Sequence, residues 1–147
     1  MENADGEKLF EKGLQALARN DTLAALAYFE RAVHVEDRPL YSSHLAFCIA
    51  KERGQYQLAV TLCEKAIAKE PRSSVHRLNL GRIYVIAKKK SDAIRTFREG
   101  LQHEKNPQII EELDRLGTRK PPVIPFLKRE NIINKYLGIA LHRIGLR

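Results

Sequence analysis

The sequence predicts an all-α protein, built as a solenoid of stacked helical hairpins. Two observations carry this prediction. A set of small and apolar positions recurs with a fixed 34-residue period, in three copies and without insertion. Between these positions, apolar side chains follow helical spacing and are separated by polar or glycine-containing breaks. A fixed period of this length indicates hairpins that stack, because one hairpin cannot bury its apolar face alone.

The recurring positions define the register of the three copies. Counting back one period at a time gives four matched sets: Gly81, Phe47 and Gly13; Ala93, Ala59 and Ala25; Phe97, Cys63 and Phe29; Gly100, Ala66 and Ala32. Small side chains at these sites would let the two helices of a hairpin approach closely. We expect the larger third set to fill the space between hairpins. Three copies are about the minimum for a stable stack.

The first hairpin is expected at residues 6–39. Asp5 would cap a helix that ends near Arg19, and Asp21 would cap a second helix, at residues 22–35. Pro39 closes the unit, because proline disfavours helical geometry in the residue before it.

The second hairpin is expected at residues 40–73, with helices at 40–53 and 56–69. Gly54 lies at the break, where a left-handed conformation costs a glycine little. Pro71 then closes this unit as Pro39 closes the first.

The third hairpin is expected at residues 74–107. Ser73 or Ser74 would cap its first helix, Lys88-Lys89-Lys90 would form the turn, and Ser91 or Asp92 would cap its second helix.

A capping helix at residues 107–117 should follow the third hairpin. Asn106 supplies a cap, Pro107 suits the first helical turn, and Gly117 ends the helix. Because its apolar residues occupy one face and charged residues the other, this helix can close the stack against water. We therefore assign residues 1–117 to the solenoid domain.

Residues 118–147 form a basic extension that the repeat does not cover. Three prolines within residues 121–125 exclude a continuous helix there. Apolar residues from Ile133 to Ile144 then follow helical spacing and predict a C-terminal amphipathic helix. We expect this helix to pack on the solenoid. It would cover the open end, lie in a groove, or mediate self-association of two chains, and the sequence leaves these three roles open.

Composition limits the class of protein. The chain has 147 residues and a net charge of +8, with seven basic and one acidic side chain in residues 118–147. No apolar run is long enough to span a membrane, and the start of the chain does not resemble a secretory signal. Cys48 and Cys63 are too few for a disulfide framework, and both are expected to be buried thiols. A cytoplasmic protein is expected.

At this point the residues resemble the tetratricopeptide-repeat (TPR) family over residues 6–117. The third copy carries the resemblance best, with Leu80-Gly81-x-x-Tyr84 followed by Ala93-x3-Phe97. It departs from the family pattern at Arg77 and Gly100, and the second copy departs at Phe47, where local repacking is expected. The resemblance implies that the hairpin solenoid is right-handed. It also implies a concave groove, lined by the first helix of each hairpin, that binds a peptide or helix of another protein.

By position, the resemblance places eleven residues in this partner-binding groove: Phe10, Leu14, Leu17, Tyr41, His44, Leu45, Cys48, Leu78, Asn79, Arg82 and Val85. A subclass of the family holds the carboxylate tail of chaperones with lysine, asparagine and arginine. The matching positions here are Phe10, Leu14, Leu45, Val75 and Asn79. Only Asn79 is polar in the required way, so the resemblance predicts an apolar groove instead.

No residue pattern indicates catalysis. The five histidines are dispersed, no metal-ligand or phosphate-loop spacing occurs, and Glu111 and Glu112 diverge on their helix. The sequence therefore predicts a protein–protein interaction adaptor that is not an enzyme and needs no cofactor or metal. The alternative is a basic-tailed module that binds an anionic partner, either nucleic acid or a membrane surface. Nucleic acid is the weaker option, because the tail lacks interleaved exposed aromatic residues.

Overall fold

The computed structural model describes residues 2–117, and every regular element in that range is an α-helix. The helices are α1 (Glu2–Ala18), α2 (Thr22–Val35), α3 (Pro39–Arg53), α4 (Tyr56–Lys69), α5 (Ser74–Ile86), α6 (Lys90–His103) and α7 (Pro107–Arg115). The predicted all-α class is confirmed. All seven helices lie in one compact unit that ends at Leu116. The proline-containing extension and helix expected at 118–147 lie outside the described residues.

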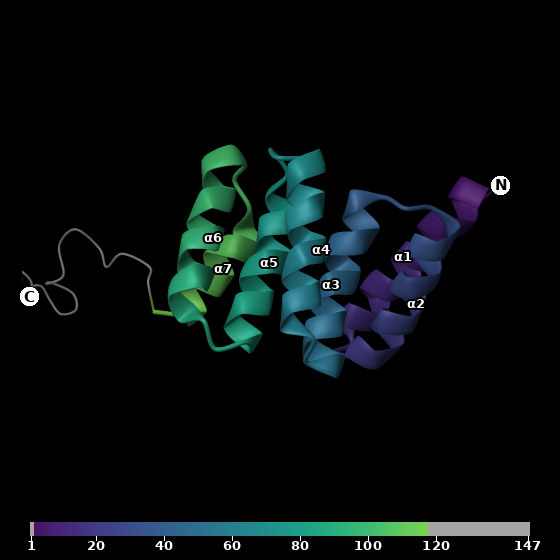
Figure 1. Cartoon of the computed structure of the whole chain (residues 1–147), viewed down its shortest axis with the longest axis horizontal. Helices are drawn as coiled ribbons and strands as arrows, with labels where there is room; N and C mark the ends of the chain where they lie inside the picture. Colours follow the sequence, from purple (N-terminus) through teal and green to yellow (C-terminus); the bar gives the residue numbers. More distant parts are fainter. Residues whose placement is uncertain (1, 118–147) are drawn as a thin grey trace, which may run out of the picture. The chain divides into compact units, whose positions relative to one another are not determined.

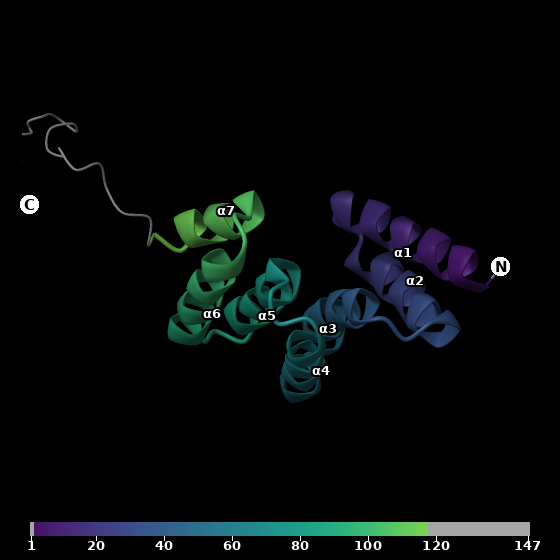
Figure 2. The same cartoon turned by 90° about the horizontal axis from the view of Figure 1, so that it is seen from above.

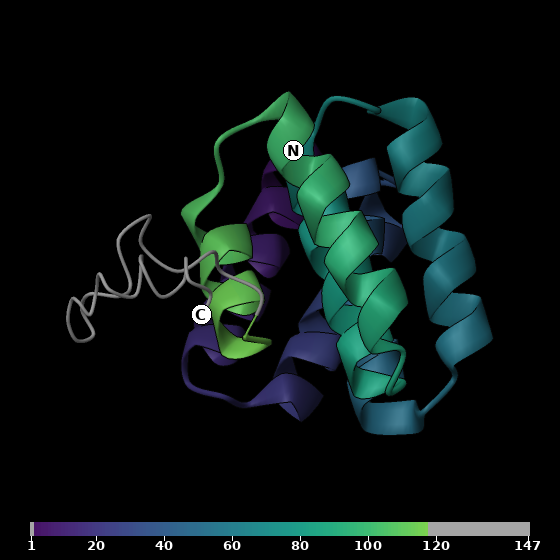
Figure 3. The ribbon, with the colours of Figure 1, turned by 90° about the vertical axis from the view of Figure 1, so that its left-hand side faces the viewer.

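The helices form three successive antiparallel hairpins, α1/α2, α3/α4 and α5/α6, followed by the single helix α7 (Figure 1). Seen from above, α1, α3, α5 and α7 follow the inner side of an arc, with α2, α4 and α6 on its outer side (Figure 2). The view along the stack shows α7 on one side of α6 and α4 on the other (Figure 3). This is the helical-hairpin solenoid that the repeat period predicts.

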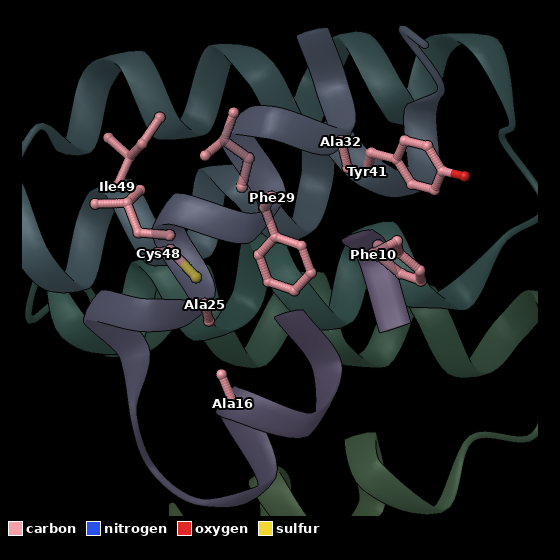
Figure 4. Close-up of a cluster of buried hydrophobic side chains, with 10 residues drawn as sticks. Phe10, Ala16, Ala25, Phe29, Ala32, Tyr41, Cys48 and Ile49 are labelled. Carbon is pink, nitrogen blue, oxygen red and sulfur yellow. The ribbon is translucent and has the colours of Figure 1, made fainter. Parts of the chain in front are cut away.

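Two phenylalanines pack against glycines within their own hairpins. The ring of Phe29 faces Gly13, where an added Cβ would lie 2.3 Å from the ring, and the ring of Phe97 faces Gly81 at 2.2 Å. The expectation that these rings fill space between hairpins is therefore incomplete. Phe29 packs within its own hairpin and also against the next one, because the centroid of its ring lies 5.5 Å from that of His44. Figure 4 shows Phe29 at the centre of this cluster, with Phe10 beside it.

The second hairpin reverses the sizes of this pair. Phe47 stands at the glycine position and Cys63 at the phenylalanine position. Cys63 is fully buried among Ala46, Ala59 and Leu80, whereas Phe47 is only partly buried and lines a surface hollow described below. At Phe47, where repacking is expected, the ring is partly buried against the core cluster of the first hairpin, and the small thiol of Cys63 fills the buried position across from it.

The turns inside the three hairpins share one backbone conformation. Asn20, Gly54 and Lys88 occupy the same position in successive repeats, and their φ angles are 60°, 67° and 65°. The conformation that the sequence predicts for Gly54 is therefore built in every copy, although two copies use residues with a side chain.

Most predicted helix ends are confirmed. Ser73 does precede α5, but its side chain makes no capping hydrogen bond, and two other predicted caps are wrong. The side chain of Asp21 accepts from Ala24 N at 3.1 Å, and that of Asn106 accepts from Gln108 N at 3.0 Å. Asp5 is not a cap, because α1 already begins at Glu2. Ser91 and Asp92 are not caps either, because the left-handed residue Lys88 shortens the turn and α6 begins at Lys90.

Candidate partner-binding groove

An apolar hollow lies on the inner side of the solenoid, with a volume of about 520 Å³. All four inner helices contribute to it. Its lining consists of seven apolar residues and three polar ones: Phe10, Leu14, Leu17, Ala18, Leu40, Val75, Leu78, His44, Arg82 and Gln108. Leu14 is 38% exposed there, although it is a large aliphatic side chain in the middle of a helix. We call this space the apolar hollow.

A second hollow of about 310 Å³ continues from the first. Leu17 and Arg82 line both, so the two form one groove along the inner helices. Its lining is more polar: Leu17, Asn20, Thr22, Phe47, Lys51, Arg82, Val85, Ile86 and Glu112. We call this space the polar hollow. Along α5 the lining includes Val75 and Val85, which are about 15 Å apart at the rise of an α-helix.

The structure brings seven of the eleven candidate groove residues to these hollows. They are Phe10, Leu14, Leu17, His44, Leu78, Arg82 and Val85. The other four, Tyr41, Leu45, Cys48 and Asn79, are buried. The ring of Tyr41 stacks on that of Phe10 at 4.9 Å, and Leu45 and Cys48 belong to the same core cluster. The candidate positions thus lie on the inner helices that also line the two hollows, but those on α3 and α5 include side chains of the buried faces.

His44 contributes an uncharged polar group to the apolar hollow. Its Nδ1–H donates to Leu40 O at 2.9 Å, and its ring meets that of Phe10 edge to face at 5.0 Å. Burial lowers the pKa of His44 to about 4, the hydrogen bond to Leu40 O opposes this shift, and the nearby charge of Arg82 acts in the same direction as burial. At neutral pH this end of the groove therefore carries no charge from His44.

Arg82 stands where the two hollows meet and is held by α7. Its Nε donates to Glu112 Oε2 at 2.6 Å, and Nη1 of Arg115 lies 3.1 Å from the same oxygen. Glu112 is only 11% exposed, so this ion pair links α5 to α7 with limited access of water. It also fixes the side of the groove formed by α7.

A buried polar network between the second and third hairpins was not found by sequence reasoning. His76 Nε2 donates to Glu70 at 2.6 Å, and the Ser43 hydroxyl lies 2.8 Å from His76 Nδ1. Asn79 Nδ2 donates to the same hydroxyl at 3.2 Å. Because a carboxylate only accepts, a ring with one proton carries it on Nε2, and Nδ1 accepts from Ser43.

The order of groups in this network, serine–histidine–carboxylate, resembles that of a nucleophilic triad. Ser43 and His76 are nevertheless both fully buried, so no substrate atom can reach the hydroxyl in this arrangement. The network instead satisfies polar groups between α3 and α5. The only sequence signal was a serine and a histidine separated by almost one repeat.

The two thiols also lie inside the fold. Cys48 and Cys63 are free and buried, and burial raises the pKa of the Cys48 thiol to about 12 and that of Cys63 further still. Within residues 2–117, no group of three or more potential metal ligands is close enough to hold an ion. No helix in that range is both long and apolar enough to cross a bilayer.

Solved structures that resemble the chain are TPR domains. The first TPR domain of human RPAP3 has a TM-score of 0.63 at 16% identity, covering 78% of this chain and 91% of that one. The Arabidopsis OM64 TPR domain has a TM-score of 0.63 at 21% identity, covering 79% and 97%. The first TPR of Spaghetti (RPAP3), bound to the HSP90 peptide SRMEEVD, has a TM-score of 0.61 at 16% identity, covering 78% and 92%.

No protein-family model and no curated protein matches the chain. The structural likeness shows the fold, and the chain has the TPR fold over its described helices.

Proposed function

We propose that this protein is an interaction module whose groove binds an amphipathic helix of another protein. The observation that carries the proposal is the apolar hollow, which gathers seven apolar side chains from four helices into one concave surface. A hollow of this size and lining is typical of a binding site. Leu14, which is 38% exposed, adds an accessible aliphatic side chain to this concave surface, and a bound helix would cover it.

A helix suits this surface better than an extended peptide does. An extended segment needs hydrogen-bond partners for its own backbone, and the apolar hollow offers only His44, Arg82 and Gln108. A helix pairs its backbone groups internally and presents only side chains. The groove length of about 15 Å fits roughly three helical turns.

The HSP90 peptide held by the Spaghetti neighbour is acidic, with two glutamates and one aspartate in its sequence SRMEEVD. At the chaperone-clamp positions this chain has Phe10, Leu14, Leu45 and Val75, with Asn79 as the fifth. Asn79 is buried and donates to Ser43, so it faces away from the groove. These features support a partner whose main contact is apolar, not a chaperone tail.

The alternative function, binding of an anionic polymer or membrane surface, rests on residues 118–147. Residues 1–117 carry 19 basic and 17 acidic side chains, so the solenoid itself is close to neutral. A partner bound through the basic extension would be lost steeply as salt rises, whereas a partner held in the apolar hollow would not.

A reducing compartment such as the cytoplasm is the setting we infer for this function. Cys48 and Cys63 are both free, and they lie in different core clusters, so neither is placed to form a disulfide with the other inside the fold.

Selection from a displayed library of amphipathic helical peptides tests the groove. The peptides would be about 16 residues long, with randomised aliphatic and aromatic residues on one face. Leu14→Asp introduces a charge into the apolar hollow. Leu58→Asp is the matched control, since Leu58 is 47% exposed and lies on α4, which lines neither hollow.

Selected peptides should bind Leu14→Asp at least tenfold more weakly than the parent protein, because a buried leucine contributes about 1.5–3 kcal/mol. Leu58→Asp should bind like the parent. Circular dichroism melts of both variants check that each is folded. Failure to select any binder, or equal loss of binding in the two variants, would contradict the proposal.

A further inference from the structure

The polar hollow carries charge that its own residues do not fully balance. It contains two cations, Lys51 and Arg82, and one anion, Glu112. Glu112 is already shared between Arg82 and Arg115. In the part of the chain that the structure describes, no ion pair involves Lys51. An acidic group entering this hollow would therefore meet an excess of positive charge.

The positions of these cations complement those of the apolar groups. Lys51 lies one helical turn beyond Phe47 on α3, and Arg82 lies one turn beyond Leu78 on α5. The apolar residues continue toward Phe10 and Leu40 in the opposite direction. The groove thus changes from an apolar end to a cationic end along its length. A partner helix lying along the groove would therefore contact apolar side chains at one end of one face and cations at the other end.

We propose that the groove selects an amphipathic helix with an acidic side chain at one end of its apolar face, bound between Lys51 and Arg82. The apolar face fills the apolar hollow, and the carboxylate lies in the polar hollow. This inference rests on the proposed function and adds the charge and position of one partner residue. Arg82 is well suited to binding this carboxylate, because its side chain is only 25% exposed and is already held in place by Glu112.

Lys51 is the better residue to test, because a change at Arg82 would also release Glu112 and disturb α7. Lys51 is exposed and has no partner within the described fold that its substitution would leave unpaired. Lys51→Gln removes the charge and keeps the length of the side chain approximately. Lys65→Gln is the matched control, since Lys65 is an exposed lysine on the outer helix α4.

The experiment uses the selected helical peptides, with the residue after the apolar face randomised among Glu, Asp, Gln, Asn, Lys and Arg. We expect acidic residues to be enriched at that position on the parent protein and on Lys65→Gln, and the enrichment to disappear on Lys51→Gln. For one selected peptide, replacing its glutamate by glutamine should weaken binding to the parent about five- to tenfold. On Lys51→Gln the same replacement should change the affinity less than twofold.

Three results would overturn this inference. The first is that acidic residues are not enriched on the parent, and the second is that their enrichment persists on Lys51→Gln. The third is that amidation of the peptide C-terminus abolishes binding, which would show that a terminal carboxylate and not a side chain occupies the site. In each case peptides that still depend on Leu14 would leave the proposed function intact. A library that yields no binder at all would contradict both.

Discussion

The ring of Phe97 lies directly against the backbone of Gly81, and a Cβ added to that glycine would be 2.2 Å from Cε1 of the ring. The first hairpin repeats the contact between Phe29 and Gly13 at 2.3 Å. Because Phe97 is fully buried, its ring cannot move away without displacing other core side chains. The close approach of α5 and α6 therefore depends on the absence of a side chain at residue 81.

We predict that Gly81→Ala destabilises the fold even though alanine is the better helix former. Through helix propensity alone, alanine should raise the free energy of unfolding by up to about 1 kcal/mol. Overpacking against Phe97 should lower the same free energy by about 1–3 kcal/mol or more. Gly6→Ala is the control, because its added Cβ would be in ordinary contact, 3.5 Å from Tyr41. Urea denaturation should show a lower free energy of unfolding for Gly81→Ala and an unchanged or higher one for Gly6→Ala.

Ser43→Ala should destabilise the fold by about 1–3 kcal/mol, because two buried polar groups would lose their partner. These groups are Nδ1 of His76 and Nδ2 of Asn79, which both meet the Ser43 hydroxyl. The neighbouring Ser42→Ala is the control. The Ser42 hydroxyl donates to Asp37 at 3.2 Å in an exposed position, so its loss should change stability by less than about 0.5 kcal/mol. Equal effects of the two substitutions in thermal melts would contradict this assignment.

The period of the sequence was enough to predict the hairpins, since spacing of small residues and helix length follow from one repeated unit. It did not predict which face of α3 is buried. Tyr41, Leu45 and Cys48 alternate with His44 and Phe47 along a helix whose polar and apolar residues are spread around its axis. Helical periodicity gives a direction only when polar and apolar residues segregate, and on α3 they do not.

The polar network and the pairing of Arg82 with Glu112 depend on contacts between separate helical units, and for that reason the sequence concealed them. Ser43 and His76 meet because equivalent positions of adjacent hairpins stack, but no local motif marks either residue. Glu112 was expected to face water on the capping helix. It is in fact buried, because Arg82 from another hairpin pairs with it.

Lys88→Gly should stabilise the protein by about 1 kcal/mol. Lys88 adopts a φ of 65°, a region in which a residue with a Cβ is strained by roughly 1–2 kcal/mol and glycine is not. Gly54 occupies the equivalent position of the second hairpin, with a φ of 67°. The flexibility of glycine in the unfolded chain offsets part of the gain. Lys90→Gly, inside the first turn of α6, is the control and should be neutral or destabilising. A lower melting temperature for Lys88→Gly would contradict the prediction.

His44 should make the stability of the protein depend on pH between about 6.5 and 4. Its pKa is about 4 in the folded protein and 6.5 when the ring is exposed to water, so in this window the unfolded chain binds a proton that the folded chain does not. The contribution of His44 to the free energy of unfolding should therefore fall as pH decreases through the window and become constant below about pH 4. The contribution of His44 should be on the order of 2 kcal/mol, since the ring is partly exposed to the groove.

The variant His44→Phe separates this contribution from that of the carboxylates, which also titrate in acid. Phenylalanine keeps a ring against Phe10 and Phe29 but cannot bind a proton. Urea denaturation at a series of pH values should give a shallower pH dependence for His44→Phe than for the parent. His34→Gln, at an exposed site, is the matched control and should follow the parent. Parallel curves for the parent and His44→Phe would show that the pKa of His44 is not lowered by folding, and that the apolar hollow gains a charge as the pH falls below 6.5.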